Sequence, residues 1–204
     1  MVRATGLFVA VDGPKGAGKT TILRHVQLQL QVRGVSVLLT KEPTLNFKLK
    51  NEENHTGIGL VRLLVDDRAY HLDEEILPGL ASYDVVLTDR YIASSVGFGV
   101  LDGVSFEDAW RLNQTFRLPD LNIFLTADES SIARRRSARV QQTRIEKKSN
   151  LYEEIELYRR IDHFLEGRGV VTKTVDNSDS HPEGLAAKAI VDIIEGEYNH
   201  RNAQ

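Results

Sequence analysis

Short apolar runs alternate with segments of helical periodicity along most of this chain. Five runs have the length and composition of buried strands, and they cover residues 6–11, 35–40, 84–89, 121–126 and 170–175. Apolar residues recur at helical spacing between these runs, in residues 21–32, 58–80, 105–117, 128–138, 151–165 and 184–198. Strands that alternate with helices predict a parallel sheet covered by helices on both faces. We therefore expect an α/β fold of three layers with a central five-stranded parallel sheet.

Glycine and proline interrupt this pattern at two places. Pro78-Gly79 breaks the apolar spacing near the end of the helix that we predict over residues 58–80. Gly97, Gly99 and Gly103 follow the third strand closely and predict a flexible stretch before the next helix. The pattern thus predicts one interrupted helix and one flexible connection.

The length and composition describe one ordinary globular domain. The chain of 204 residues can bury a sizeable core, and its content of 41% hydrophobic and 27% charged residues is typical of soluble proteins. We predict a single domain over residues 1–204, in which the polar, aperiodic segment at about 139–150 forms a mobile insertion.

The charge and the residue types exclude several classes of function. A formal charge of -3 argues against a general preference for nucleic acid or for an anionic membrane surface, so we expect neither as a partner. The chain has no cysteine, which excludes disulfides, thiolate metal sites and cysteine nucleophiles. No apolar run approaches the roughly 20 residues of a membrane helix, and the first strand begins too early to leave room for a signal peptide. We expect a cytoplasmic protein.

One segment between the first strand and the first helix fits the pattern G-x-x-x-x-G-K-[ST] without a mismatch. It reads Gly13-Pro14-Lys15-Gly16-Ala17-Gly18-Lys19-Thr20. A strand, a glycine-rich turn and a helix in this order are the context that the motif requires, which disfavours a chance match. Such a turn lets backbone N–H groups converge on phosphate oxygens, and the helix N-terminus adds partial positive charge. Lys19 is predicted to reach the β/γ-phosphates, and the Thr20 hydroxyl to ligate Mg²⁺.

The segment therefore predicts the P-loop NTPase form of the α/β fold and binding of a nucleoside triphosphate, for which ATP is our leading candidate. The residues expected to bind it are Gly13, Gly16, Ala17, Gly18, Lys19, Thr20 and Thr21.

Charged residues stand at the carboxyl ends of the predicted strands, where ligands collect in an open parallel sheet. Asp12 directly precedes the loop, so its carboxylate is expected near the transferred phosphate and the metal. Asp89 ends an apolar strand, the position at which such folds place an acid near Mg²⁺. A strand-end aspartate can equally cap a helix, but the neighbouring loop favours the functional interpretation. Arg90 is a natural clamp for a second phosphate group, because guanidinium matches phosphate oxygens bidentately.

Residues 134–148 hold seven basic residues and one acidic residue in a chain of net negative charge. Such a run can be a solvated helix face, or a nucleic-acid patch, although no aromatic residue within it could stack on bases. It can also include a lid, at about residues 139–150, that closes over the triphosphate and supplies arginines to phosphoryl transfer. We favour the lid, because a bound triphosphate must be shielded from water. The combined features predict a small-molecule kinase with a phosphorylated acceptor.

Six segments, in order and at matching spacing, carry a resemblance to one family. They are 8–21, Thr40-Lys41-Glu42-Pro43, Asp67-Arg68-Ala69-Tyr70-His71, Asp89-Arg90-Tyr91-Ile92-Ala93-Ser94-Ser95, Leu118-Pro119-Asp120-Leu121 and Thr143-Arg144-Ile145-Glu146. From end to end the chain resembles thymidylate kinases of the nucleoside monophosphate kinase group. The resemblance implies Mg²⁺-dependent transfer of the γ-phosphoryl of ATP to dTMP, giving dTDP. It also implies a homodimer formed through the helices around residues 58–80 and 105–117.

The resemblance further implies roles for individual residues. Arg68 would hydrogen-bond the thymine edge, Arg90 would hold the 5′-phosphate of the acceptor, and Phe98 would lie against the deoxyribose. The implied acceptor-binding residues are Glu42, Pro43, Leu64, Arg68, Arg90, Ser94, Ser95 and Phe98. The loop has Gly16 where one subtype of the family carries an arginine. This matches the subtype in which the lid supplies the arginine, so the implied catalytic residues are Asp12, Lys19, Arg90, Arg139 and Arg144.

The chain departs from the family pattern mainly on the acceptor side. Thr44 follows Pro43 where the family has glycine, and Leu64 stands where an aromatic ring often stacks on thymine. Gly97-Phe98-Gly99 replaces A-Y-Q, and Thr143 replaces the usual aspartate of the lid. An alternative is therefore a divergent kinase of another pyrimidine nucleoside monophosphate, with a modified or an unmodified base. A nucleotide-binding regulator without turnover is a second alternative, which the intact donor residues disfavour.

Overall fold

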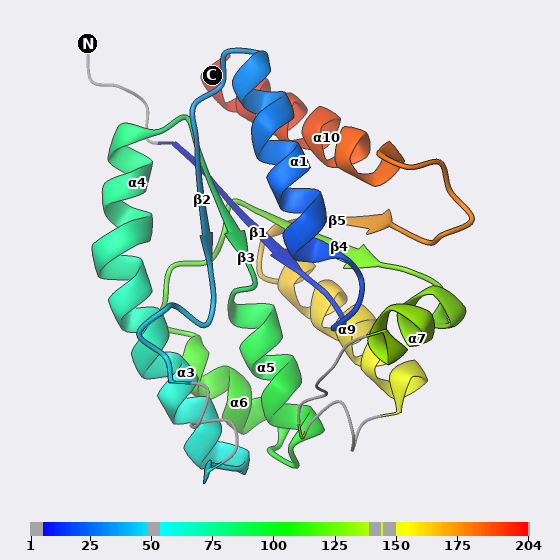
Figure 1. Ribbon diagram of the computed structural model, residues 1–204. Helices are drawn as coiled ribbons and strands as arrows, with labels where there is room; N and C mark the ends of the chain where they lie inside the picture. The colour runs from blue at the N-terminus through cyan, green and yellow to red at the C-terminus, as the bar shows by residue number, and fades with distance from the viewer. Residues whose placement is uncertain (1–5, 49–53, 139–143, 145–149, 204) are drawn as a thin grey trace.

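The computed structural model describes residues 6–48, 54–138, 144 and 150–203. Its strands are β1 (Leu7–Asp12), β2 (Val37–Lys41), β3 (Val85–Asp89), β4 (Leu121–Thr126) and β5 (Val171–Asp176). They form one five-stranded sheet in the order β2-β3-β1-β4-β5, and every neighbouring pair is parallel (Figure 1). The predicted α/β fold with a central parallel sheet is confirmed.

The position of a strand in the sheet explains its sequence. β1 lies at the centre and is buried along its whole length, which accounts for its unbroken apolar run. β5 lies at an edge and buries only Thr172 and Val175, so most of its positions can be polar. Because β1 is central, the turn that follows it reaches the neighbouring ends of β3 and β4.

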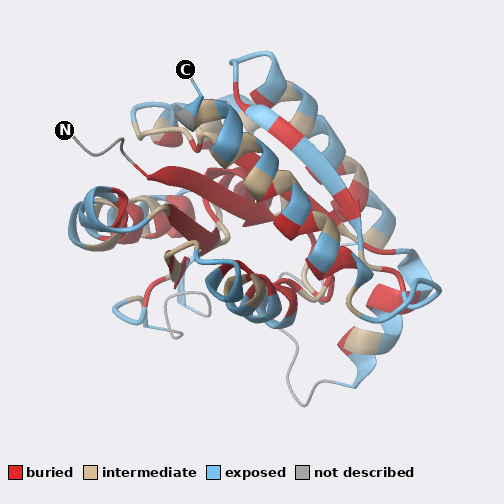
Figure 2. Ribbon diagram, turned by 90° about the horizontal axis from the view of Figure 1, so that it is seen from above, coloured by how far each residue is buried: buried red, intermediate tan, exposed pale blue. Residues whose placement is uncertain are grey.

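Helices cover both faces of the sheet. On one face, α1 (Lys19–Val32) and α10 (Leu185–Asn202) pack on alternate residues of β1 such as Val9 and Val11. On the other face, Phe8 and Ala10 pack against α4 (Leu77–Ser82), α5 (Ile92–Leu101) and α9 (Leu151–Glu166). Figure 2 shows the buried strands between these helices, whose outer sides are exposed. The three predicted layers are thus present.

The expected interruption at Pro78-Gly79 is wrong. α3 (Gly57–His71) continues through a π-helical segment, Leu72–Ile76, into α4, which ends only at Ser82. Pro78 directly follows the π-helical segment, so the proline lies within a continuous run of helix and does not end it. Gly79 is needed for packing, because a Cβ there would lie 2.6 Å from Cδ2 of Leu38.

The expected flexible stretch at residues 97–99 is also wrong, since both glycines lie inside the buried helix α5. α5 packs closely on α3 and on α6 (Phe106–Asn113), which is shorter than predicted. A Cβ at Gly99 would lie 2.8 Å from Cγ2 of Val61 and 3.2 Å from Cβ of Ala109. The glycines therefore permit a close approach of helices. In the described part of the chain, no helix is long and apolar enough to cross a bilayer.

Candidate active site

The turn between β1 and α1 needs glycine for steric reasons. Gly13 adopts a φ of 141°, and a Cβ there would lie 2.1 Å from the carbonyl oxygen of Leu125. Gly16 adopts a φ of 95°, in the left-handed region that favours glycine. This turn wraps a hollow of about 230 Å³ that is lined by Lys15, Gly16, Gly18, Lys19, Thr20, Thr21, Asp89 and Arg90. We call this space the phosphate hollow.

The Lys19 ammonium is held inside the loop. Its Nζ donates hydrogen bonds of 2.9 Å to the carbonyl oxygens of Gly13 and Pro14. Burial, and after it the positive charge of Arg90, lowers the pKa of Lys19 well below its ordinary value. A bound polyanion would supply the negative charge that this buried cation lacks.

Thr20 and Asp89, the two predicted metal ligands, lie side by side. Thr20 Oγ1 donates a hydrogen bond of 2.5 Å to Asp89 Oδ2. The strand register explains the contact, because Asp89 of β3 is the neighbour of Val11 at the end of β1. A hydroxyl and a carboxylate next to a phosphate site are the oxygen ligands that Mg²⁺ prefers, so these residues fit the ion.

Asp12 is fully buried at the end of β1 and orders the start of α5. Its Oδ1 accepts hydrogen bonds from the backbone N–H groups of Tyr91 and Ser94, both at 3.0 Å, and from the Ser94 hydroxyl at 2.5 Å. Its Oδ2 has no hydrogen-bond partner among the described residues. Burial raises the pKa of the Asp12 carboxyl above its ordinary value.

Arg90 lies between the loop and α5 in a constrained backbone conformation, with a φ of 80°. Its Nη1 donates to the Gly13 carbonyl at 3.3 Å and to Ser94 Oγ at 3.0 Å. Its guanidinium lies over the ring of Phe98, with Cζ 5.0 Å from the ring centroid. The structure therefore brings three of the predicted acceptor residues together beside the phosphate loop.

Seven of the predicted acceptor residues line one narrow space, which we call the acceptor hollow. Its lining consists of Glu42, Pro43, Leu64, Arg90, Ser94, Ser95 and Phe98, with Tyr91 in addition. Its volume of about 10 Å³ is too small for a nucleotide base. A base would therefore bind at the open side of this space or displace side chains of its wall.

Arg68 lies behind the acceptor hollow and is completely buried. Its guanidinium donates to both carboxylate oxygens of Glu42, to Ser95 Oγ at 2.8 Å and to Asn113 Oδ1. Arg68 thus supports the wall that Glu42 and Ser95 form and does not line the hollow in this structure. The predicted contact between Arg68 and the base stays a prediction.

The predicted lid is only partly covered by the structure, and Arg139 lies outside the described residues. Arg144 is described, and both of its terminal nitrogens donate to the carboxylate of Asp102 at the end of α5. Its Nη2 also lies 3.3 Å from the carbonyl oxygen of His55. Arg144 is therefore not among the described residues that line the phosphate hollow.

The structure adds residues to the site that the sequence interpretation missed. Arg135 of α7 (Glu129–Ser137) donates to the carbonyls of Gly16 and Ala17 at 3.4 and 3.3 Å. Asn177, after β5, donates to the Ala17 carbonyl at 2.8 Å. Buried loop carbonyls need hydrogen-bond donors, but the sequence does not show which residues supply them.

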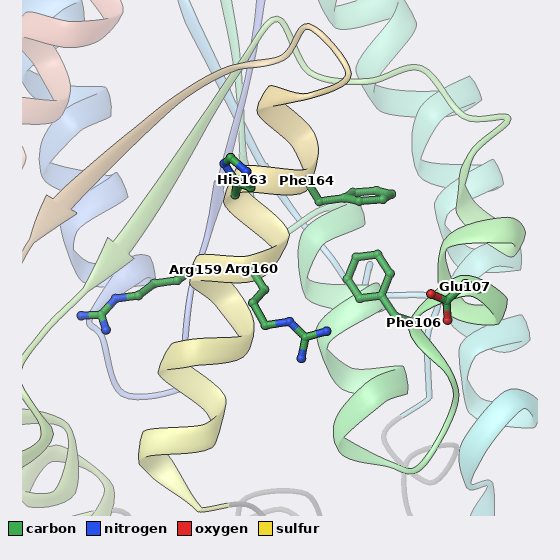
Figure 3. Close-up of a pocket in the computed structure, with 6 residues that line it drawn as sticks. All are labelled: Phe106, Glu107, Arg159, Arg160, His163 and Phe164. Carbon is green, nitrogen blue, oxygen red and sulfur yellow. The ribbon is translucent and has the colours of Figure 1, made fainter.

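A wider hollow lies elsewhere, between α6 and α9. It has a volume of about 540 Å³ and is lined by Phe106, Glu107, Arg159, Arg160, His163 and Phe164 (Figure 3). Of the described residues that we predict for the site, none lines it. The phosphate loop, and not the size of a hollow, locates the candidate active site.

Comparisons with known proteins identify the family of this chain. A family model described as thymidylate kinase matches residues 11–180, a range that includes every site residue described above. A thymidylate kinase of Xanthomonas euvesicatoria pv. vesicatoria (strain 85-10) is 29% identical over 208 residues, covering 94% of this chain and 88% of that protein. A thymidylate kinase of Finegoldia magna is 32% identical over 162 residues, covering 72% and 79%.

The match to a thymidylate kinase of Xanthomonas oryzae pv. oryzae (strain PXO99A) is shorter. The two sequences are 35% identical over 126 residues, and the match spans 59% of this chain and 56% of that relative. The family model covers most of the chain, and the motif-based resemblance is confirmed. The chain belongs to the thymidylate kinase family.

Proposed function

We propose that this protein transfers the γ-phosphoryl group of ATP to dTMP, giving ADP and dTDP. One observation carries the proposal, namely that Arg90 lines both the phosphate hollow and the acceptor hollow. A guanidinium at this place can bind a phosphate group of each substrate and neutralise the charge between them. The two hollows thus meet at the point where a phosphoryl group would be transferred.

The proposed reaction needs no nucleophile from the protein. An oxygen of the acceptor phosphate attacks the γ-phosphorus in line, the new P–O bond forms, and the bond to the leaving ADP oxygen breaks. Lys19 and Arg90 stabilise the charge of the transferred group. Asp12 holds Ser94 and the start of α5 in place beside Arg90. Thr20 and Asp89 would hold the Mg²⁺ ion, which neutralises triphosphate charge when it is bound.

Arg139 and Arg144 remain our candidates for the arginines that the lid contributes. Arg144 would have to leave the carboxylate of Asp102 before it could reach a bound triphosphate. Substrate binding would then compete with this ion pair, and Asp102→Asn should raise the affinity for ATP if Arg144 is the acting arginine.

A second acceptor is favoured by the wall of the acceptor hollow. Thr44 is turned toward α3, since its N–H and hydroxyl donate to Asp67 at 2.8 and 2.5 Å. Leu64 packs with Leu60, Phe47 and Phe98 in an apolar cluster. Arg68, the residue expected to bind the thymine edge, is buried behind this wall and paired with Glu42, so the described contacts do not single out thymine among the pyrimidines. A kinase of another pyrimidine nucleoside monophosphate is therefore the second candidate function.

A panel of acceptors tests both candidates. The protein is incubated with ATP, Mg²⁺ and one of dTMP, dUMP, dCMP, UMP, CMP or AMP, and ADP formation is followed by a coupled assay. We expect the highest kcat/KM with dTMP. A higher value with another pyrimidine would favour the second candidate. If none of the monophosphates in the panel supported ADP formation, both candidates would be contradicted. Lys19→Met serves as the control for contaminating kinases.

We propose in addition that the protein is a homodimer through α3 and α6. Support comes from large apolar side chains on the surface of the α3–α4 segment, where Ile58 is 41%, Tyr70 46% and Leu77 44% exposed. Sedimentation equilibrium should give twice the chain mass, and Tyr70→Glu should shift the protein toward monomer. A monomeric wild-type protein at micromolar concentration would contradict the dimer.

A further inference from the structure

Two buried charged side chains that the proposed reaction does not use meet at Lys15 of the phosphate loop. Arg136 comes from α7 and is 7% exposed, and Glu154 comes from α9 and is 3% exposed. Arg136 Nε donates to the carbonyl oxygen of Lys15 at 2.8 Å. The N–H of Lys15 donates to Glu154 Oε1 at 3.1 Å, and Arg136 Nη2 donates to Glu154 Oε2 at 2.6 Å.

These contacts form a closed ring that holds both backbone polar groups of Lys15. Lys15 itself lines the phosphate hollow, so the ring fixes the first part of the loop beside the expected triphosphate. A buried ion pair contributes little net stability, because removing both charges from water costs about as much as their attraction returns. The specific contribution of this pair is the backbone orientation that it imposes.

The orientation matters because of the sign of the backbone dipoles. A loop binds phosphate through N–H groups, and a carbonyl oxygen that turned toward the phosphate would repel it. Arg136 holds the Lys15 carbonyl, and the adjacent Arg135 holds those of Gly16 and Ala17. Donors from α7 thus fix three successive loop carbonyls.

Gly16 gives Arg136 the space that it needs. A Cβ at Gly16 would lie 3.3 Å from Cγ of Arg136 and 3.0 Å from Cγ2 of Ile132. The aliphatic part of the Arg136 side chain therefore packs against the loop at Gly16, where there is no Cβ atom. A larger residue at position 16 would push α7 away and separate Arg136 from Lys15.

We propose that Arg136 and Glu154 are positioning residues that hold the phosphate loop in its triphosphate-binding conformation. The inference rests on the proposed function in one respect, namely that the loop binds ATP. Through these two residues the helices α7 and α9, which lie on either side of the predicted lid in the sequence, contact the phosphate loop directly. Neither side chain is required to touch the substrate.

The test is a double variant, Arg136→Met with Glu154→Gln, which removes both buried charges together. The amide oxygen that replaces the Glu154 carboxylate can still accept the Lys15 N–H, while the Lys15 carbonyl loses its donor. ATP binding is measured by calorimetry, turnover by KM for each substrate, and stability by thermal unfolding. We expect the Kd and the KM for ATP to rise about tenfold, with the KM for dTMP and the unfolding temperature nearly unchanged.

Matched variants keep the outcome interpretable. Glu154→Gln alone leaves Arg136 buried without its carboxylate, so it should lower the unfolding temperature, which the double variant restores. If the double variant does not fold, Arg136→Lys is measured in its place. This variant keeps the positive charge, but one ammonium replaces the two guanidinium nitrogens that bind Lys15 and Glu154. Arg33→Lys, which alters the pair with Glu195 at 2.5 Å on the far end of α1, is the control without effect on ATP.

Three results bear on the inference. An ATP Kd of the double variant within about twofold of the wild type would overturn it. An equal rise of the KM for dTMP would also overturn it, since that pattern indicates a general loss of structure. Failure of the wild-type protein to bind ATP would instead contradict the proposed donor site, so the two failures are distinguishable.

Discussion

The hydroxyl of Thr20 donates a 2.5 Å hydrogen bond to Asp89, 69 residues later in the chain. The parallel register of β1 and β3 creates this contact, because it places the last residue of β3 next to the beginning of the phosphate loop. This hydrogen bond links the phosphate loop to β3 before any substrate is bound. It also places a hydroxyl and a carboxylate where one cation can bind to both.

Asp89→Asn should weaken the binding of Mg²⁺. The amide keeps the shape of the side chain and can still accept the Thr20 hydrogen bond, but it removes a negative charge from the site. We expect the Mg²⁺ concentration for half-maximal rate to rise about tenfold or more, with little change in the unfolding temperature. An unchanged Mg²⁺ titration would show that Asp89 does not act on the metal.

Lys19→Met should abolish phosphoryl transfer while the fold remains intact. The Lys19 ammonium donates to the loop carbonyls of Gly13 and Pro14, and Met fills a similar volume. In the proposed reaction Lys19 also donates to the transferred group, and the loss of that donor is expected to cost about 10³-fold or more in kcat. Circular dichroism and thermal unfolding provide the control, and turnover near the wild-type rate would overturn the donor site.

Asp12→Asn should stabilise the protein at neutral pH and remove activity. Burial raises the pKa of Asp12 in the folded state above its unfolded value of 3.8. The stability that this group contributes is therefore fully present below that value and is lost as the pH rises through the folded pKa. The variant should unfold at a higher temperature than the wild type at pH 8, and the difference should shrink as the pH falls toward 4.

The pH dependence of the stability difference between Asp12→Asn and the wild type can also contradict this prediction. If the stability difference between Asp12→Asn and the wild type widened toward low pH, the carboxylate would be stabilised in the folded state, contrary to the effect of its burial. Melting curves at several pH values between about 4 and 8 decide between the two cases.

Gly99→Ala should destabilise the packing of α5. The new methyl group would lie 2.8 Å from Val61 Cγ2, too close for ordinary van der Waals contact. We expect a loss of about 1–3 kcal/mol in the free energy of unfolding, measured by urea denaturation. Gly97→Ala in the same helix is the matched control, because its nearest neighbours would lie at 3.6 Å, an ordinary contact distance. Equal effects of the two variants would contradict the packing argument.

Much of the sheet and the donor site follows from local sequence. An apolar run such as that of β1 is typical of a strand buried on both faces, and the strict phosphate-loop pattern places Lys19 and Thr20 at the start of a helix. The prediction for the glycines of α5 was wrong, because a glycine that permits a turn and one that permits close packing look alike in sequence. Only the neighbours of Gly99, on α3 and α6, distinguish the two.

The different contacts of the consecutive arginines 134–136 could not be predicted from the sequence either. The side chain of Arg134 is 68% exposed, Arg135 reaches the carbonyls of Gly16 and Ala17, and Arg136 is buried against Glu154. Consecutive residues of a helix point about 100° apart, so the roles depend on how α7 is rotated against the loop. That rotation is set by tertiary packing, through contacts such as Ile132 against Gly16.

The position of Lys19 has a consequence for selectivity. Its ammonium gives two of its three N–H donors to carbonyl oxygens of its own loop, so one donor remains for a ligand. A ligand that takes more than one donor from Lys19 must displace a loop carbonyl, and binding then becomes an exchange of partners. Because a triphosphate can engage other loop N–H groups at the same time, we expect it to drive this exchange more readily than a single phosphate or sulfate ion.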